Sequence, residues 1–290
     1  MTVLDSLFRN AEVDGFLHAV DLGTGAEVEH GGGEPVVLAS VFKIPVLLEL
    51  FVQGAQGRLD LAAPHPVPAE GRSPGPYGIS VMRDLLTMSL RDLAWLMMGI
   101  SDNAATDVIC DVVTIDRVNG RIAELGLRDT HLVGACRDLF ASIGEDLGIS
   151  DPGLLAKLDL TDAAVIDRLR VIDPRATSRS TPRDVTTLLT QIWDDTAGSP
   201  HVCGEVRRIL GLQVWPHRLA AGFPEDGVTT SGKTGTLPRW RNEAGVVEYP
   251  DGGRYAVAVF TRSASTAQKN PAADAAIGAA ARAAVDLLRS

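Results

Sequence analysis

The chain has 290 residues, of which 45% are hydrophobic and 22% are charged, and it carries a formal net charge of −10. A chain of this size can bury a large core and can form two domains. The acidic balance disfavours nucleic acid and anionic membranes as partners. The sequence shows neither a leader nor an apolar run long enough to cross a bilayer, which predicts a cytoplasmic protein as written, or a secreted or periplasmic one if a leader was removed.

The three cysteines and six histidines show no spacing typical of a disulfide framework or a metal site. We therefore expect no metal and no cofactor. The sequence does not indicate the oligomeric state.

The first predicted element is a hairpin over residues 15–32, where apolar residues alternate on either side of the turn-forming residues 22–25. A helix is predicted from Ser40 onward, and its first residues are almost all apolar, which is typical of a buried helix. After a Pro/Gly-rich loop at 63–78, the apolar spacing predicts helices over 81–100, 104–113, 115–126, 162–170 and 182–193.

Strands return near the end of the chain, over 227–236 and in two alternating runs within 242–262, before a small-residue helix from Pro271. Strands from the two ends of a chain can pair in one antiparallel sheet, leaving the middle as a helical lobe. The predicted fold class is thus α/β, of the α+β type in which the strands form an antiparallel sheet. The predicted domains are a discontinuous sheet domain at 1–39 and 216–290 and an all-helical domain at 40–215. We expect the active site in the cleft between them.

Three short strings in this framework carry chemistry. Ser40 and Lys43 are three residues apart at a helix start, so the hydroxyl and the amine share one face. The string Ser-Asp-Asn at 101–103 lies between two predicted helices, and Lys-Thr-Gly at 233–235 lies on a predicted strand. Taken singly, the two strings that begin with Ser are typical of helix caps, and Lys-Thr-Gly is typical of an ordinary strand. Their joint occurrence in this order favours a shared site.

The set S-x-x-K, S-D-N and K-T-G resembles the class A β-lactamase and penicillin-binding-protein superfamily of active-site serine hydrolases. The resemblance extends to the early hairpin, to the Thr-Pro that opens the helix at 182–193, and to the strands and helix after the K-T-G. It implies a β-lactamase/transpeptidase-like fold with a five-stranded antiparallel sheet flanked by helices.

The resemblance also implies a role for each residue. Ser40 is the expected nucleophile, Lys43 the amine that activates it, and Ser101 a proton relay. Asn103 is expected to orient Lys43 and bind a substrate amide, and the N–H groups of Ser40 and Thr236 to form an oxyanion hole. Asp102 is expected to be structural. Lys233 is expected to be catalytic, by favouring the neutral form of Lys43, and to bind a substrate carboxylate with Thr234, Gly235 and Thr236. Arg218, Arg239 and Arg241 are candidates to reinforce the carboxylate site, although a solvated surface position is the ordinary role for each. Tyr77 and Trp240 are candidates to line the cleft, although packing is the ordinary role of such aromatic residues.

One departure bears on turnover. Class A β-lactamases have an E-x-x-L-N loop whose Glu serves deacylation, and no such string occurs between Asn103 and Thr181. A longer, helix-like insertion over 132–174 stands there. Asp138 is the candidate deacylation base, with Glu145 and Asp146 as alternatives, but surface roles are the ordinary ones for all three. Slow deacylation, or deacylation by an atypical base, is therefore expected.

Three hypotheses remain open from the sequence. The first is a β-lactamase-like serine hydrolase that forms an acyl-enzyme on a β-lactam, a related cyclic amide or an ester. The second is a penicillin-binding D-alanyl-D-alanine peptidase or an esterase. The third is a non-catalytic binding protein with the same fold, which retention of the whole set of polar residues disfavours.

Overall fold

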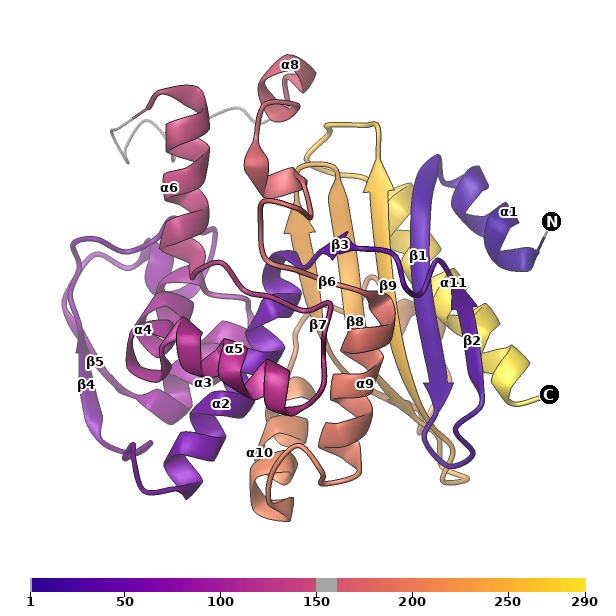
Figure 1. Cartoon of the computed structure of the whole chain (residues 1–290), viewed down its shortest axis with the longest axis horizontal. Coiled ribbons are helices and arrows are strands. Elements are labelled where there is room, and N and C mark those ends of the chain that lie inside the picture. Colours follow the sequence, from indigo (N-terminus) through magenta and orange to yellow (C-terminus); the bar gives the residue numbers. More distant parts are fainter. Residues whose placement is uncertain (1, 150–160) are drawn as a thin grey trace.

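The computed structural model describes residues 2–149 and 161–290. Its main sheet has five antiparallel strands in the order β2-β1-β9-β8-β7 (Figure 1). The strands are β1 (Val13–Asp21), β2 (Glu27–His30), β7 (Thr229–Leu237), β8 (Trp240–Glu248) and β9 (Arg254–Ser263). Pairing of β1 with β9 joins the two ends of the chain, and the predicted five-stranded antiparallel sheet is confirmed.

Helices cover both faces of this sheet. Successive residues of β9 point to opposite faces, so Val257 and Val259 pack with one apolar cluster while Ala258 and Phe260 pack with another. The first cluster lies under α1 (Val3–Asn10) and α11 (Pro271–Leu288), and the second under α9 (Pro182–Trp193). The small side chains of α11 let that helix approach the strands closely.

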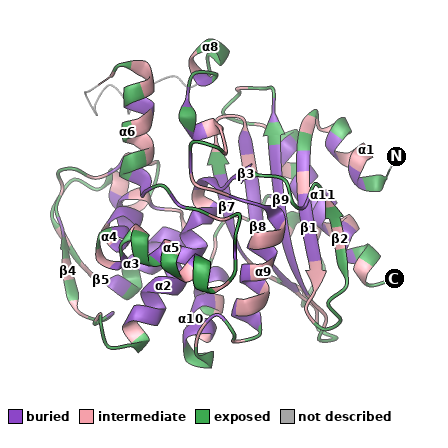
Figure 2. Ribbon diagram, in the orientation of Figure 1, coloured by how far each residue is buried: buried purple, intermediate pink, exposed green. Residues whose placement is uncertain are grey.

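The helical lobe is built around α2 (Lys43–Ala55), whose apolar side chains are buried on nearly every side (Figure 2). This explains why the sequence of α2 lacks a polar face. Its neighbours are α3 (Leu90–Gly99), α4 (Asn103–Val113), α5 (Ile115–Glu124) and α10 (Pro200–Leu210). The insertion contributes α6 (Cys136–Leu147), which contacts α4, and the short α8 (Ala163–Ile166); residues 150–160 of the insertion lie outside the described residues.

Several local predictions differ from the structure. The helix predicted over 81–100 begins only at Leu90, because Ser89 caps α3 and residues 86–89 form β5 (Leu86–Ser89), paired with β4 (Pro64–Val67). A second short pair joins β3 (Val36–Val37) to β6 (Arg179–Ser180). The segment 40–215 is therefore mostly helical but includes three short strands, and its α9 packs on the main sheet. Within the described residues, no helix is long and apolar enough to span a membrane.

Candidate active site

Ser40 lies in a short 3-10 helix (Ala39–Phe42) that leads directly into α2. The helix predicted from Ser40 thus begins as a 3-10 turn and becomes α-helical at Lys43. Ala39 before it has a positive φ of 46°, an unfavourable conformation for a residue with a Cβ. The buried Asn242 of β8 donates from its side-chain amide to Val37 O at 2.8 Å and Leu38 O at 3.3 Å. The backbone before the nucleophile candidate is therefore fastened to the sheet.

Lys43 is fully buried, and its Nζ has three oxygen partners: Ser101 O at 2.9 Å, Ser101 Oγ at 3.2 Å and Asn103 Oδ1 at 3.2 Å. Burial lowers the pKa of this amine from its ordinary value. In its neutral form, the amine lone pair can accept a proton from a neighbouring hydroxyl. The first two sequence strings thus meet at one nitrogen.

The Ser-Asp-Asn string forms the turn between α3 and α4. Ser101 adopts a positive φ of 64°, and Asp102 caps α4 by accepting the Ala105 N–H at 3.1 Å. Asp102 also accepts from Ile79 N at 2.5 Å and Ser80 Oγ at 3.0 Å. Because three donors occupy its carboxylate, Asp102 holds the 3-10 helix Gly78–Val81 in place, in line with the structural role expected of it.

The Lys-Thr-Gly string lies on β7, the edge strand of the sheet. Lys233 is fully buried and donates to Thr234 O at 2.8 Å; burial, reinforced by repulsion from Lys43, lowers its pKa well below the ordinary value. Gly235 lies directly against the turn that carries Ser40. A Cβ on Gly235 would stand 2.8 Å from Leu38 O and 3.2 Å from Ser40 N. The absence of a side chain therefore permits the close approach of the two segments.

The register of β7 directs two N–H groups off the open edge of the sheet. Thr234 donates its N–H to Gln213 Oε1 at 2.6 Å rather than to β8. Because residues two apart in an antiparallel strand direct their N–H groups to the same side, the Thr236 N–H also points away from β8. That group and the Ser40 N–H flank the contact at Gly235.

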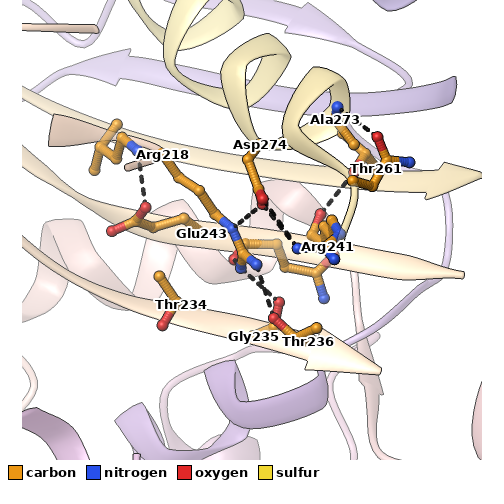
Figure 3. Close-up of polar contacts among 12 residues, drawn as sticks. Arg218, Thr234, Gly235, Thr236, Arg241, Glu243, Thr261, Ala273 and Asp274 are labelled. Carbon is orange, nitrogen blue, oxygen red and sulfur yellow. Dashed lines mark hydrogen bonds and ion pairs between the residues drawn. The ribbon is translucent and has the colours of Figure 1, made fainter. Parts of the chain in front are cut away.

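Two arginines converge on one carboxylate behind β7 (Figure 3). Arg218 Nε contacts Asp274 Oδ1 at 2.6 Å, and Arg241 pairs with the same carboxylate at 3.0 Å. Arg218 also donates to Gly235 O and Asn242 O, each at 2.9 Å, and to Thr236 Oγ1 at 2.8 Å. Its guanidinium thus links β7, β8 and α11, and sets the orientation of the Thr236 hydroxyl.

These groups surround a cavity of about 510 Å³. Tyr77 and Trp215 contact each other at its rim, with ring centroids 5.1 Å apart. Asp102 is the sole carboxylate that lines the cavity among the described residues, and its oxygens are already occupied. The lining comprises Ser40, Gly75, Pro76, Tyr77, Ile100, Ser101, Asp102, Asn103, Trp215, His217, Arg218, Thr234, Thr236, Gln268 and Lys269.

Some candidates lie away from this cavity. Arg239 pairs with Asp167 at 2.6 Å, beyond the turn that follows β7. Trp240 is buried, donates to Ile172 O and stacks near Phe16. Arg241 is engaged by Asp274 and does not line the cavity. Arg239 lies in the turn between β7 and β8, and the Arg241 guanidinium is held by Asp274 of α11.

The candidate bases of the insertion are engaged in local structure. Asp138 is exposed, accepts the Ala135 N–H at 2.8 Å at the start of α6, and lines a separate small cavity beside Ala39 and Phe42. Glu145 and Asp146 both pair with Arg170 at 2.6 Å. None of the three lines the cavity that contains Ser40.

The structure adds residues that the sequence analysis did not single out. The Cys136 Sγ lies 3.4 Å from Asn103 Oδ1. Glu243 accepts from Gln213 Nε2 at 2.7 Å and Leu219 N at 2.8 Å, so it fastens both ends of the segment that carries Trp215. Burial raises the pKa of Glu243. Two features of the sequence could have drawn attention to these residues. For Cys136 the feature was the odd number of cysteines, and for Glu243 it was a Glu within an otherwise apolar strand.

Comparisons with known proteins agree with the fold. The β-lactamase regulatory protein BlaB of Streptomyces cacaoi is 31% identical over 98% of this chain and 96% of its own. A β-lactamase from Sphaerobacter thermophilus has a TM-score of 0.79 at 26% identity, covering 98% of this chain and 96% of that one. PBP-A matches with a TM-score of 0.77 at 21% identity over 99% and 95% of the two chains, a likeness of fold. The profile of the Beta-lactamase enzyme family matches residues 2–288, and the chain belongs to that family.

Proposed function

We propose that this protein is an active-site serine hydrolase of the β-lactamase and penicillin-binding type, acylated at Ser40 by a β-lactam, a related cyclic amide or an ester. The observation that carries the proposal is the buried Lys43 amine, held by Ser101 and Asn103 behind the cavity that Ser40 lines. A desolvated amine of lowered pKa is a suitable general base for a serine hydroxyl.

The cavity offers a position for each part of such a substrate. The carbonyl oxygen lies between the N–H groups of Ser40 and Thr236. A substrate carboxylate contacts the hydroxyls of Thr234 and Thr236, with Arg218 behind them as a positive charge. Ser101 passes a proton to the leaving nitrogen or oxygen.

Deacylation is proposed to be slow. A hydrolytic water needs a base, and the one carboxylate among the described cavity-lining residues, Asp102, already accepts three hydrogen bonds. A persistent acyl-enzyme suits a protein that binds β-lactams as much as one that destroys them. The regulatory protein BlaB, 31% identical to this chain, favours β-lactam binding in a regulatory role as the second candidate function.

The intact mass after incubation with penicillin tests the proposal, with Ser40→Ala as the matched variant. We expect a gain equal to the whole drug in the wild type and no gain in Ser40→Ala. A mass gain that persists for hours indicates a binding or regulatory protein, whereas rapid return with product formation indicates a β-lactamase. Equal labelling of both proteins, or labelling of neither by penicillins and ester substrates, contradicts acylation at Ser40.

A further inference from the structure

Cys136 is the first residue of α6, and its thiol lies beside the polar centre of the site. Its Sγ is 3.4 Å from Asn103 Oδ1, the same oxygen that accepts from Lys43 Nζ at 3.2 Å. The Asn103 Nδ2 donates in the opposite direction, to Pro74 O at 2.8 Å. The amide is thus held at both ends, and the S–H is one of the two donors that keep its oxygen directed at Lys43.

A separate contact fixes the position of Cys136. Asp107 lies one turn after Asn103 on α4, and its Oδ1 accepts the Arg137 N–H at 3.0 Å at the start of α6. A carboxylate at a helix N-terminus is favourable because it satisfies unpaired N–H groups. The α4–α6 contact therefore places residue 136 beside residue 103.

The charge at position 136 matters because the amine beside it is buried. Burial raises the pKa of the Cys136 thiol to about 11, so the thiol is neutral at physiological pH. The groups that face Lys43 electrostatically come from α4, α6, β7 and the turn before α4: Asp102, Asp107, Cys110, Cys136 and Lys233. Of the two carboxylates in this set, Asp102 already accepts three hydrogen bonds, and Asp107 accepts the Arg137 N–H through Oδ1.

We propose that Cys136 is a positioning residue of the acylation site, which directs the Asn103 amide oxygen at Lys43 while keeping an uncharged group beside that amine. The proposal rests on the proposed function for its consequence, because a neutral Lys43 is the base that activates Ser40. A carboxylate at position 136 repels the Asn103 oxygen and favours the ammonium form of Lys43. The neutral Cys136 thiol therefore leaves Lys43 free to act as the acylation base, whereas a carboxylate at position 136 would favour the ammonium form of Lys43.

The test measures Lys43 directly and does not depend on acylation. The chain has only four lysines, at positions 43, 157, 233 and 269, so a protein grown with ε-¹³C-lysine gives few signals to assign by substitution. We expect Cys136→Asp to raise the midpoint of the Lys43 titration by about one pH unit or more. Cys136→Ser, which keeps a neutral donor, is expected to leave the midpoint within about 0.3 unit of the wild type.

Cys203→Ala is the matched control, since Cys203 is also buried but lies on α10, away from the cavity. A Cys136→Asp midpoint that moves no more than the Cys203→Ala midpoint overturns the proposal. Should Cys136→Asp not fold, the neutral pair decides: Cys136→Ala is expected to acylate several-fold more slowly than Cys136→Ser. Equal rates for that pair overturn the proposal, whereas absence of labelling in the wild type contradicts the proposed function instead and leaves the titration to decide.

Discussion

Gly235 lies against the backbone of Ser40, so closely that a Cβ on Gly235 would stand 3.2 Å from Ser40 N and 2.8 Å from Leu38 O. Backbone atoms fastened by Asn242 cannot move aside as a flexible side chain would. The contact sets how far apart the Ser40 and Thr236 N–H groups lie, and those two groups are the proposed oxyanion hole.

Gly235→Ala is therefore expected to separate β7 from the Ser40 turn. We expect the acylation rate to fall by about 10²–10³, as when one oxyanion-hole donor is lost, with a stability loss of about 1–3 kcal/mol from overpacking. Stopped-flow labelling with a fluorescent penicillin and urea unfolding measure the two effects.

Gly120→Ala is the matched control for that substitution. Gly120 lies in α5 with open space around its Cβ position, so alanine there is expected to stabilise the helix by about 1 kcal/mol and to leave acylation unchanged. A Gly235→Ala protein that acylates at the wild-type rate would show that this contact does not set the geometry of the site.

The acylation rate is expected to rise with pH, because the neutral form of Lys43 is the active one. Burial favours that form, so the midpoint lies below the ordinary lysine value of 10.5. Lys43→Arg keeps the positive charge at every accessible pH, and we expect it to slow acylation by about 10²–10⁴. The measurement is the labelling rate from pH 5 to 10 in both proteins, with thermal melts to confirm folding; a flat wild-type profile would contradict a lysine base.

Arg218 is expected to be a major determinant of stability, because its buried guanidinium joins Asp274, β7 and β8. Arg218→Ala leaves two buried carbonyls without these donors and is expected to cost about 3–5 kcal/mol in the free energy of unfolding. Arg262→Ala is the control, since the exposed Arg262–Asp14 pair is expected to contribute less than about 1 kcal/mol. Similar urea midpoints for the two variants would show that the Arg218 cluster does not stabilise the fold.

The three motif strings, the individual strands of the sheet and the absence of an E-x-x-L-N string could all be recognised from the sequence, because each depends on residues adjacent in the chain. Ser40 and Lys43 are one turn apart, so their shared face is fixed once the helix is assigned. Contacts such as Cys136 with Asn103 were not accessible in this way, since they depend on how α6 docks on α4.

The direction of individual side chains and the pairing of short segments also could not be predicted from the sequence. Arg239 and Trp240 follow the K-T-G closely, yet the chain reverses at Arg239, which has a positive φ of 65°, and both side chains leave the cavity. Likewise, residues 86–89 have helical spacing but pair with 64–67, because a tertiary partner for the backbone outweighed local propensity.

Tyr77 and Trp215 both line the cavity, and their ring centroids lie 5.1 Å apart. Tyr77 is 47% exposed, so a substrate ring can displace or extend this contact. Such aromatic pairs contribute about 0.5–1.5 kcal/mol beyond their burial. We therefore expect Tyr77→Ala and Trp215→Ala to weaken binding of penicillins with an aromatic acyl group about 2–10-fold before acylation, and to affect aliphatic acyl groups less. A double-mutant cycle on the concentration dependence of labelling measures the coupling, and additive effects with no preference between acyl groups would show that the pair does not act as one binding surface.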